Sequence, residues 1–138
     1  MHQEQSNEVR NRILLSLGSN WQAEQHMQLA IQLLQARFHT LRFSEAIWME
    51  ALNYPQSVGP FLNRVAVGWV GESPVEIQAC LKSIECQLGR RSEQKAAGVV
   101  VIDLDLLQWN DRILKPADLQ RPYVRSGLAS LGIPTDQA

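Results

Sequence analysis

The chain lacks the sequence features that mark membrane-spanning, disulfide-rich and nucleic-acid-binding proteins. No apolar run reaches the roughly 18 residues that a membrane-spanning helix needs. The only two cysteines, Cys80 and Cys86, lie nearly two turns apart in one predicted helix, so they point to different faces and cannot pair. The formal net charge is only −1, and basic and aromatic residues do not interleave, which argues against binding to nucleic acid. We therefore expect a cytoplasmic protein without membrane or nucleic-acid partners.

The N-terminus also lacks the apolar core that a signal sequence carries. Residues 1–9 are mostly polar and are predicted to be a disordered extension. Hydrophobic residues make up 45% and charged residues 20% of the chain, which is the balance of an ordinary globular protein. There are no internal repeats or low-complexity segments, so residues 1–138 are predicted to form a single domain.

Apolar periodicity divides the chain into strands and helices. Apolar positions that repeat every two residues predict strands, and those that repeat every three or four predict helices. In order, the predicted elements are a strand over 12–17, a helix that includes 27–38, a strand over 41–47, a strand over 61–70, a helix over 74–88 and a strand over 99–107. Gly18-Ser19-Asn20 is expected to form a turn and to begin the first helix.

This order predicts an α+β fold, a ferredoxin-like split β-α-β sandwich. A four-stranded antiparallel sheet would carry both helices on one face and leave the other face open for a ligand. Beyond the turn at Asn110-Asp111, only short segments are expected.

The second predicted helix has local start and stop signals. Ser73 can act as the N-cap, Pro74 occupies the first helical position, and Glu76 completes a capping box. Gly89 is expected just past the end of the helix. The polar stretch 90–98 that follows has no periodicity, and such loops are often functional lids.

Two aspartates alternate with aliphatic residues in the last predicted strand. Side chains at positions i and i+2 of a strand share a face and lie about 7 Å apart, so Asp103 and Asp105 are expected to project together. Ile102, Leu104 and Leu106 are expected on the opposite face. Two neighbouring carboxylates repel unless a proton or a cation lies between them, and such oxygen ligands suit Mg²⁺ together with substrate phosphates. An edge strand with a solvated acidic face is the alternative interpretation.

Five motifs, in this order along the chain, are similar to those of one enzyme family. They are Leu17-Gly18-Ser19-Asn20, Phe61-Leu62-Asn63, Ser73-Pro74, Ile84-Glu85 with Leu88-Gly89-Arg90, and Ile102-Asp103-Leu104-Asp105-Leu106-Leu107. On these motifs the chain resembles the 6-hydroxymethyl-7,8-dihydropterin pyrophosphokinase family over nearly everything from Ile13 to Ile133. The resemblance implies Mg²⁺-dependent transfer of pyrophosphate from ATP to 6-hydroxymethyl-7,8-dihydropterin in folate biosynthesis. We expect a monomer or a weak dimer.

The resemblance also implies roles for individual residues. Asp103 and Asp105 correspond to the ligands of two Mg²⁺ ions. Asn63, Phe61 and Leu52 correspond to residues that bind the pterin.

Three further residues correspond to positions at the nucleotide. They are Glu85, Arg90 and Arg125, and Arg90 is also expected to act in catalysis because a guanidinium can grip phosphate oxygens with two hydrogen bonds. Structural alternatives remain open. Asn63 can cap a turn, Glu85 can be a surface charge, and Arg90 can bind the last carbonyls of the helix.

The sequence departs from the family pattern around the expected site. The family has Trp-Gly-Pro-Arg before the acidic strand, and this chain has Ala97-Gly98-Val99-Val100. A stacking wall and a phosphate contact are therefore missing. Ser92 stands where a second arginine is usual, Arg91 is displaced by one position, and Met49-Glu50 replaces a Thr-Pro pair. Lys95 is a candidate to bring a positive charge back into the site.

The tail differs as well. Lys115-Pro116-Ala117-Asp118 lacks the histidine of the family, and Arg121 competes with Arg125 as the match to the tail arginine. Two other interpretations are therefore open. One is a catalytically impaired paralogue that binds a pterin-like or nucleotide ligand, or a protein partner, without turnover. The other is a phosphotransferase with a changed acceptor.

Overall fold

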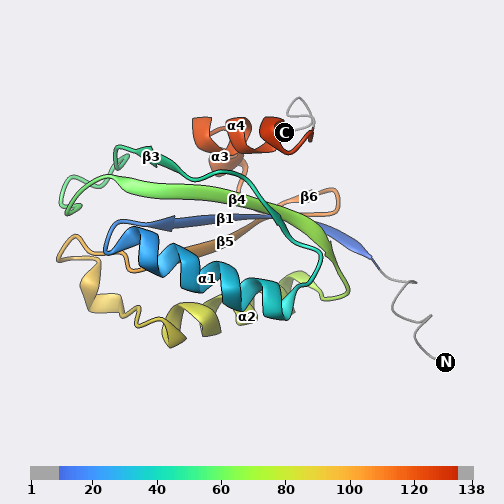
Figure 1. Ribbon diagram of the computed structural model, residues 1–138, viewed down its shortest axis with the longest axis horizontal. Helices are drawn as coiled ribbons and strands as arrows, with labels where there is room; N and C mark the ends of the chain where they lie inside the picture. The colour runs from blue at the N-terminus through green and yellow to red at the C-terminus, as the bar shows by residue number, and fades with distance from the viewer. Residues whose placement is uncertain (1–9, 134–138) are drawn as a thin grey trace.

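The computed structural model describes residues 10–133, which form one antiparallel sheet with helices on both faces (Figure 1). The predicted disordered extension, 1–9, lies outside the described residues. The strand order is β2-β4-β1-β5-β6, and β3 also pairs with β4. The strands are β1 (Asn11–Ser19), β2 (Arg42–Phe43), β3 (Ile47–Met49), β4 (Phe61–Val70), β5 (Asp103–Trp109) and β6 (Arg112–Ile113). The helices are α1 (Ala23–Arg37), α2 (Pro74–Gln87), α3 (Pro116–Leu119) and α4 (Pro122–Ser130), with a 3₁₀ turn η2 (Ser92–Gln94).

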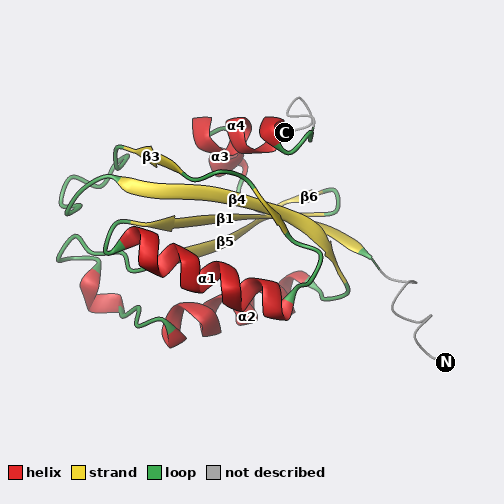
Figure 2. Cartoon of the chain, viewed as in Figure 1, coloured by secondary structure: helices red, strands yellow, loops and turns green. Residues whose placement is uncertain are grey.

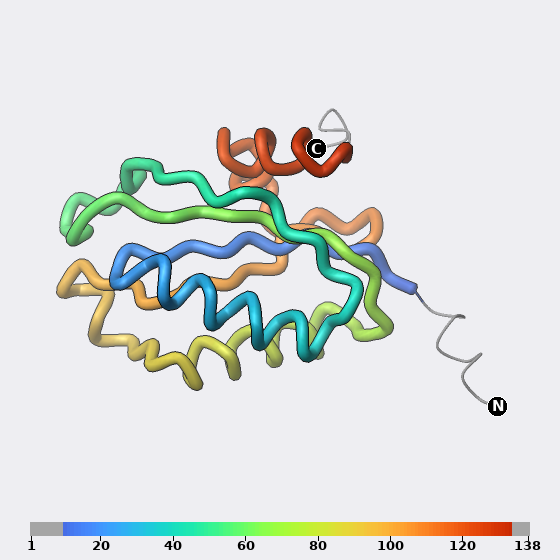
Figure 3. The backbone as a smooth tube through the Cα atoms, viewed as in Figure 1, coloured from blue at the N-terminus to red at the C-terminus, as the bar shows by residue number. Residues whose placement is uncertain are grey.

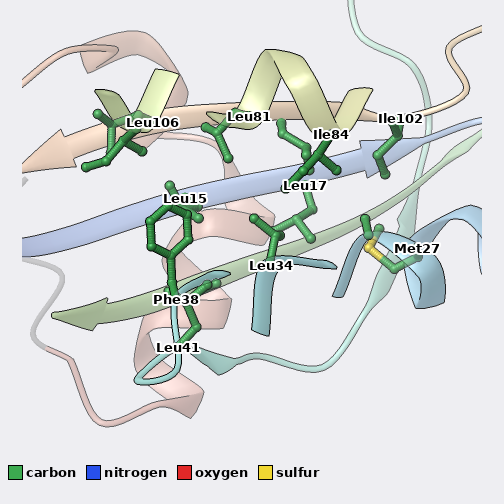
Figure 4. Close-up of a cluster of buried hydrophobic side chains, with 14 of the residues drawn as sticks. Leu15, Leu17, Met27, Leu34, Phe38, Leu41, Leu81, Ile84, Ile102 and Leu106 are labelled. Atoms are coloured by element: carbon green, nitrogen blue, oxygen red, sulfur yellow. The ribbon is translucent and has the colours of Figure 1, made fainter. Parts of the chain in front are cut away.

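Helices α1 and α2 cover one face of the sheet and bury the larger part of the core against it (Figures 1 and 2). Apolar side chains of both helices meet those that β1, β4 and β5 point to this face. Figure 4 shows this cluster, which includes Leu15, Leu17, Leu34, Phe38, Leu81, Ile84, Ile102 and Leu106. Burial on this scale is the main favourable contribution to folding.

The ends of α2 follow the local signals in the sequence. The Ser73 hydroxyl accepts a hydrogen bond from the Glu76 backbone N–H at 3.3 Å, and the Glu76 carboxylate accepts one from the Ser73 N–H at 2.9 Å. This reciprocal pair is the predicted capping box. Gly89 follows the helix with a φ of 100°, a value that residues with a side chain rarely adopt.

The sheet has six strands where four were predicted. The expected strand over 41–47 is divided into β2 and β3 at Ser44. There the Ser44 hydroxyl accepts the hydrogen bond of the Val65 N–H at 3.0 Å, which interrupts the backbone ladder. The additional strand, β6, forms a hairpin with β5 around Asn110, whose φ is 52°.

The expectation that helices cover only one face is wrong for the tail. Helices α3 and α4 lie across the opposite face (Figure 1), where Val124 and Leu128 of α4 pack against Leu14, Val65 and Leu107 of the sheet. The spacing of these two apolar residues is helical, but the segment is too short for periodicity alone to predict it.

Two boundaries also differ from the sequence prediction. Gly18-Ser19-Asn20 does not begin the first helix, because β1 continues through Ser19 and α1 begins at Ala23. Residues 99–102 precede β5 rather than forming part of it. Both segments are held by long-range hydrogen bonds described below. Within residues 10–133, no helix combines the length and apolar character needed to cross a membrane.

Candidate active site

A cavity of about 280 Å³ lies on the part of the sheet that α3 and α4 leave uncovered. Its floor comes from three neighbouring strands. Gly18 of β1 pairs with Asn63 of β4 on one side and with Asp103 of β5 on the other. Ser16 of β1 pairs in the same way with Asp105. Because paired residues share a face, the predicted Asn63 and the two aspartates project into one cavity from adjacent strands.

Gly18 leaves room between the two sides of this floor. A Cβ atom at this position would lie 3.1 Å from the Asn63 Oδ1 and 3.6 Å from the Phe61 ring. The absence of a side chain therefore keeps the Asn63 amide accessible from the cavity.

Four parts of the chain build the rim of the cavity. The end of β3 and the segment after it contribute Met49, Glu50 and Leu52, and the start of β4 contributes Phe61. The loops on either side of the cavity contribute Tyr54, Lys95 and Val100, and the tail contributes Asp118, Arg121 and Tyr123. The cavity is therefore apolar near Phe61 and Leu52 and charged near β5.

Arg90 joins the acidic strand to the end of α2. Its Nη1 donates hydrogen bonds to the Glu85 Oε2 at 3.0 Å, to the Asp103 Oδ1 at 2.9 Å and to the Ile102 carbonyl at 3.1 Å. Burial lowers the pKa of the Arg90 guanidinium, but the hydrogen bond with Asp103 and the negative charges of Asp103, Glu85 and Asp105 together outweigh burial and raise it. Arg90 is thus a fixed cation at the edge of the cavity.

Glu85 is the buried partner that orients Arg90. It is only 6% exposed, and its Oε2 also accepts the Leu104 backbone N–H at 2.7 Å. Burial raises the pKa of this carboxyl group, while the bonds to Leu104 and Arg90 act in the opposite direction. Glu85 does not line the cavity. It lines an adjacent groove between α2 and β5, together with Lys82, Arg90 and Lys115.

Asp105 carries the most strongly shifted carboxyl group of the site. Burial, and then the neighbouring charge of Asp103, raise its pKa from the ordinary value of 3.8 to about 6. The Lys115 ammonium lies 3.6 Å from its Oδ1 and favours the charged form. A carboxylate held in this way gains from any further cation at the same place.

The acidic pair fits Mg²⁺ better than a metal that needs a full protein cage. Among residues 10–133, no group of three or more His, Cys, Asp or Glu side chains could hold a metal ion. Mg²⁺ is commonly bound by one or two carboxylates, with water and substrate phosphates completing its coordination. Asp103 and Asp105 supply such a partial set of oxygen ligands.

The structure brings together most of the predicted site residues and leaves two outside the cavity. Asn63, Phe61, Leu52, Arg90, Asp103 and Asp105 all line it. Glu85 lies behind Arg90, as described above. Arg125 is not among the lining residues, and its Nη1 donates to the Gln120 Oε1 at 3.2 Å.

The tail supplies Arg121, which the sequence analysis named as the alternative to Arg125, and Tyr123, to which it gave no role. Arg121 lines the cavity in place of Arg125, and its Nε donates to the Asp118 Oδ1 at 3.0 Å. Tyr123 lines the same wall, and burial raises the pKa of its phenol. Nothing in the local sequence marks Tyr123 or decides between Arg121 and Arg125, because the tail reaches the site only through the packing of α4 on the sheet face that carries the cavity.

Comparison with known proteins identifies the family to which the chain belongs. The sequence model of the 7,8-dihydro-6-hydroxymethylpterin-pyrophosphokinase (HPPK) family matches residues 14–133. The match spans most of the chain, so the chain belongs to the HPPK family, whose members are ATP-dependent pyrophosphokinases of folate synthesis.

The other comparisons add little. No curated protein matches the chain. Among solved structures, the C-terminal domain of the MgtC protein from Mycobacterium tuberculosis is similar at a TM-score of 0.40 and 11% identity, over 72% of this chain and 89% of that chain. A likeness of this size carries no argument about function.

Proposed function

We propose that the protein transfers pyrophosphate from ATP to 6-hydroxymethyl-7,8-dihydropterin and that the reaction depends on Mg²⁺. The observation that carries the proposal is the single cavity in which Asn63, Phe61 and Arg90 lie with Asp103 and Asp105. An apolar end with one amide suits a flat heterocycle, and a charged end with two carboxylates suits metal-bound phosphates. Family membership supplies the identity of the two substrates.

The acceptor would occupy the apolar end. The Asn63 amide offers one donor and one acceptor for the edge of the ring. Phe61 and Leu52 would pack against the ring, and the position of Gly18 keeps the approach to Asn63 open. In this arrangement the hydroxymethyl group would point toward β5.

The phosphates would occupy the charged end. Two Mg²⁺ ions held by Asp103 and Asp105 would neutralise charge on the phosphoryl oxygens during transfer. Arg90, oriented by Glu85, supplies a fixed positive charge beside them. Arg121, which lines the cavity, would add a second positive charge from the tail. Attack of the pterin hydroxyl oxygen on the β-phosphorus would break the bond from that phosphorus to the α-phosphate oxygen. AMP would leave with this oxygen, and the hydroxyl proton would pass to solvent water.

The test incubates the protein with ATP, Mg²⁺ and the pterin alcohol. Chromatography then measures the formation of AMP and of the pterin pyrophosphate. We expect the wild type to form both products and the double variant Asp103→Asn/Asp105→Asn to lose at least about 10²-fold in rate. Asp111→Asn is the matched control because Asp111 is exposed in the β5–β6 turn. Equal rates in the wild type and the double variant would contradict the proposal.

A second candidate is a family member that binds its ligands without turnover. The observation that favours it is the pairing of cations with the protein's own carboxylates. Arg90 pairs with Glu85 and Asp103, Lys115 with Asp105, and Arg121 with Asp118. Val100 lines the cavity at the position where the family pattern has an arginine. A bound triphosphate would have to break some of these ion pairs.

Calorimetric titration separates the two candidates. Mg²⁺-dependent binding of a non-hydrolysable ATP analogue, together with AMP formation from ATP, supports the enzyme. Binding without any AMP supports the second candidate. No binding up to millimolar concentration would contradict both.

A further inference from the structure

One buried side chain, Asn20, joins the segments that form the two sides of the cavity. Asn20 is only 9% exposed and lies directly after β1. Its backbone N–H donates to the Val100 carbonyl at 3.0 Å, and its Oδ1 accepts the Val100 N–H at 2.7 Å. Its Nδ2 donates to the Ser57 hydroxyl at 2.8 Å and to the Gly98 carbonyl at 2.9 Å. Both polar ends of the side chain are therefore engaged.

The segments that Asn20 joins are far apart in the sequence and lie side by side in the fold (Figure 3). One is the loop 53–60, which carries Tyr54 and leads into Phe61. The other is 94–102, which carries Lys95 and Val100 and leads into Asp103. Thus one amide links the apolar wall of the cavity to the segment that precedes the acidic pair.

The two loops also contact each other directly. The Val58 N–H donates to the Gly98 carbonyl at 2.9 Å, and the Tyr54 hydroxyl donates to the Lys95 carbonyl at 2.6 Å. Gly98 has a φ of 85°, and a Cβ there would clash with the Gln56 carbonyl. The Asn20 amide bonds to Ser57 of one loop and Gly98 of the other, next to this contact.

We propose that Asn20 is a positioning residue that fixes the acceptor-binding wall relative to Asp103 and Asp105 before any ligand binds. The proposal rests on the proposed function, because the two groups it aligns are the pterin pocket and the phosphate-binding carboxylates. A buried amide that loses its partners leaves donors and acceptors unsatisfied on both loops. The two walls would then move independently, and a reacting group displaced by about 1 Å can lose about 10²-fold in rate.

Asn11 provides a matched control at the other end of β1. It is 7% exposed, its Nδ2 donates to the Glu72 carbonyl at 3.2 Å, and its Oδ1 accepts from the Asn110 Nδ2 at 3.0 Å. Asn11 does not line the cavity. Removing its side chain should affect stability as removal of Asn20 does, but without moving either wall.

The first experiment is hydrogen exchange of the wild type, Asn20→Ala, Asn20→Asp and Asn11→Ala without ligand. We expect Asn20→Ala to speed exchange at least tenfold in both 54–60 and 94–102, and Asn11→Ala to change neither. Asn20→Asp keeps an acceptor for the Val100 N–H and loses the donor for the Ser57 hydroxyl and the Gly98 carbonyl. Exchange should therefore rise in both segments, but less than in Asn20→Ala. Equal exchange in Asn20→Ala and Asn11→Ala, or a change confined to one segment in Asn20→Ala, would overturn the proposal.

The second experiment measures steady-state kinetics at a temperature where all variants are folded. We expect Asn20→Ala to lower kcat/KM for the pterin alcohol about 10- to 100-fold and to leave the KM for ATP within about twofold. Asn11→Ala should match the wild type in both. An unchanged kcat/KM in Asn20→Ala would overturn the positioning role. If the wild type itself forms no AMP, the proposed function fails, and hydrogen exchange alone then decides whether Asn20 joins the two walls.

Discussion

The sheet face that carries α3 and α4 has a closed half and an open half, and the same three strands build both. In the closed half, Leu14, Val65 and Leu107 pack under α4. Two residues further along each strand, Ser16, Asn63 and Asp105 line the cavity. Side chains two positions apart in a strand share a face, so the side chains of both halves point in the same direction from the sheet. Residue type alone decides which half a helix can cover.

This comparison separates stability from function within one surface. The apolar side chains of the closed half gain free energy when the tail helices remove them from water. The carboxylates of the open half would lose solvation under such a cover. The cavity therefore lies on the part of the face that the tail helices do not cover. The tail also brings Asp118 and Arg121 to the edge of the cavity.

The largest expected effect is on stability, from a change in the closed half. Leu107 is fully buried between the sheet and the tail helices. Leu107→Ala should lower the free energy of unfolding by about 2–5 kcal/mol, because it removes apolar contacts and leaves a cavity. Denaturant titration measures the change. Ile113→Ala, at a position that is 40% exposed, is the control and should change it by less than about 1 kcal/mol. Equal losses in the two variants would break the comparison.

A smaller and opposite effect is expected from the open half. The pKa of Asp105 is raised to about 6 in the folded protein, so folding takes up a proton between about pH 4 and pH 6 and the ionised carboxylate destabilises the fold above that range. Asp105→Asn removes this charge. At pH 7.5 without Mg²⁺ it should raise the free energy of unfolding by about 1–2 kcal/mol, allowing for partial exposure.

Measuring the free energy of unfolding of Asp105→Asn and the wild type over a series of pH values tests whether the charge of Asp105 causes this difference. The gain from Asp105→Asn should shrink as the pH falls from 6 to 4, where the wild-type carboxyl group becomes protonated. Asp111→Asn should show no such trend, because Asp111 is exposed. A gain that stays constant down to pH 4 would mean that the charge of Asp105 is not its source.

The smallest expected effect is on ligand affinity. Gly18→Ala would place a methyl group 3.1 Å from the Asn63 Oδ1. Because Asn63 must give slightly to accept this contact, we expect the Kd of the pterin alcohol to rise by about 5- to 20-fold, which corresponds to about 1–2 kcal/mol. Calorimetry measures the Kd, and thermal unfolding should move by only a few degrees. An unchanged Kd would mean that the acceptor does not approach over Gly18.

Local rules predicted the elements whose signals lie within a few residues. The capping box of Ser73 and Glu76, the end of α2 at Gly89, and the shared face of Asp103 and Asp105 all depend on neighbouring residues alone. The same rules failed at Asn20 and at 99–102, where long-range hydrogen bonds hold the chain. They also failed at Ser44, where a side-chain hydroxyl interrupts the ladder that the apolar pattern predicted.

The sequence by itself determined the family, the order of the main strands and helices, and the acidic pair, because these are carried by motifs and by a periodicity of two residues. Only the tertiary structure decided that α4 covers half of the second face, that Arg121 rather than Arg125 lines the cavity, and that Asn20 joins the two loops. These features depend on contacts between residues far apart in the chain, such as Asn20 and Val100, which are 80 positions apart. No local pattern encodes such contacts, because they form only when the whole sheet brings its distant strands together.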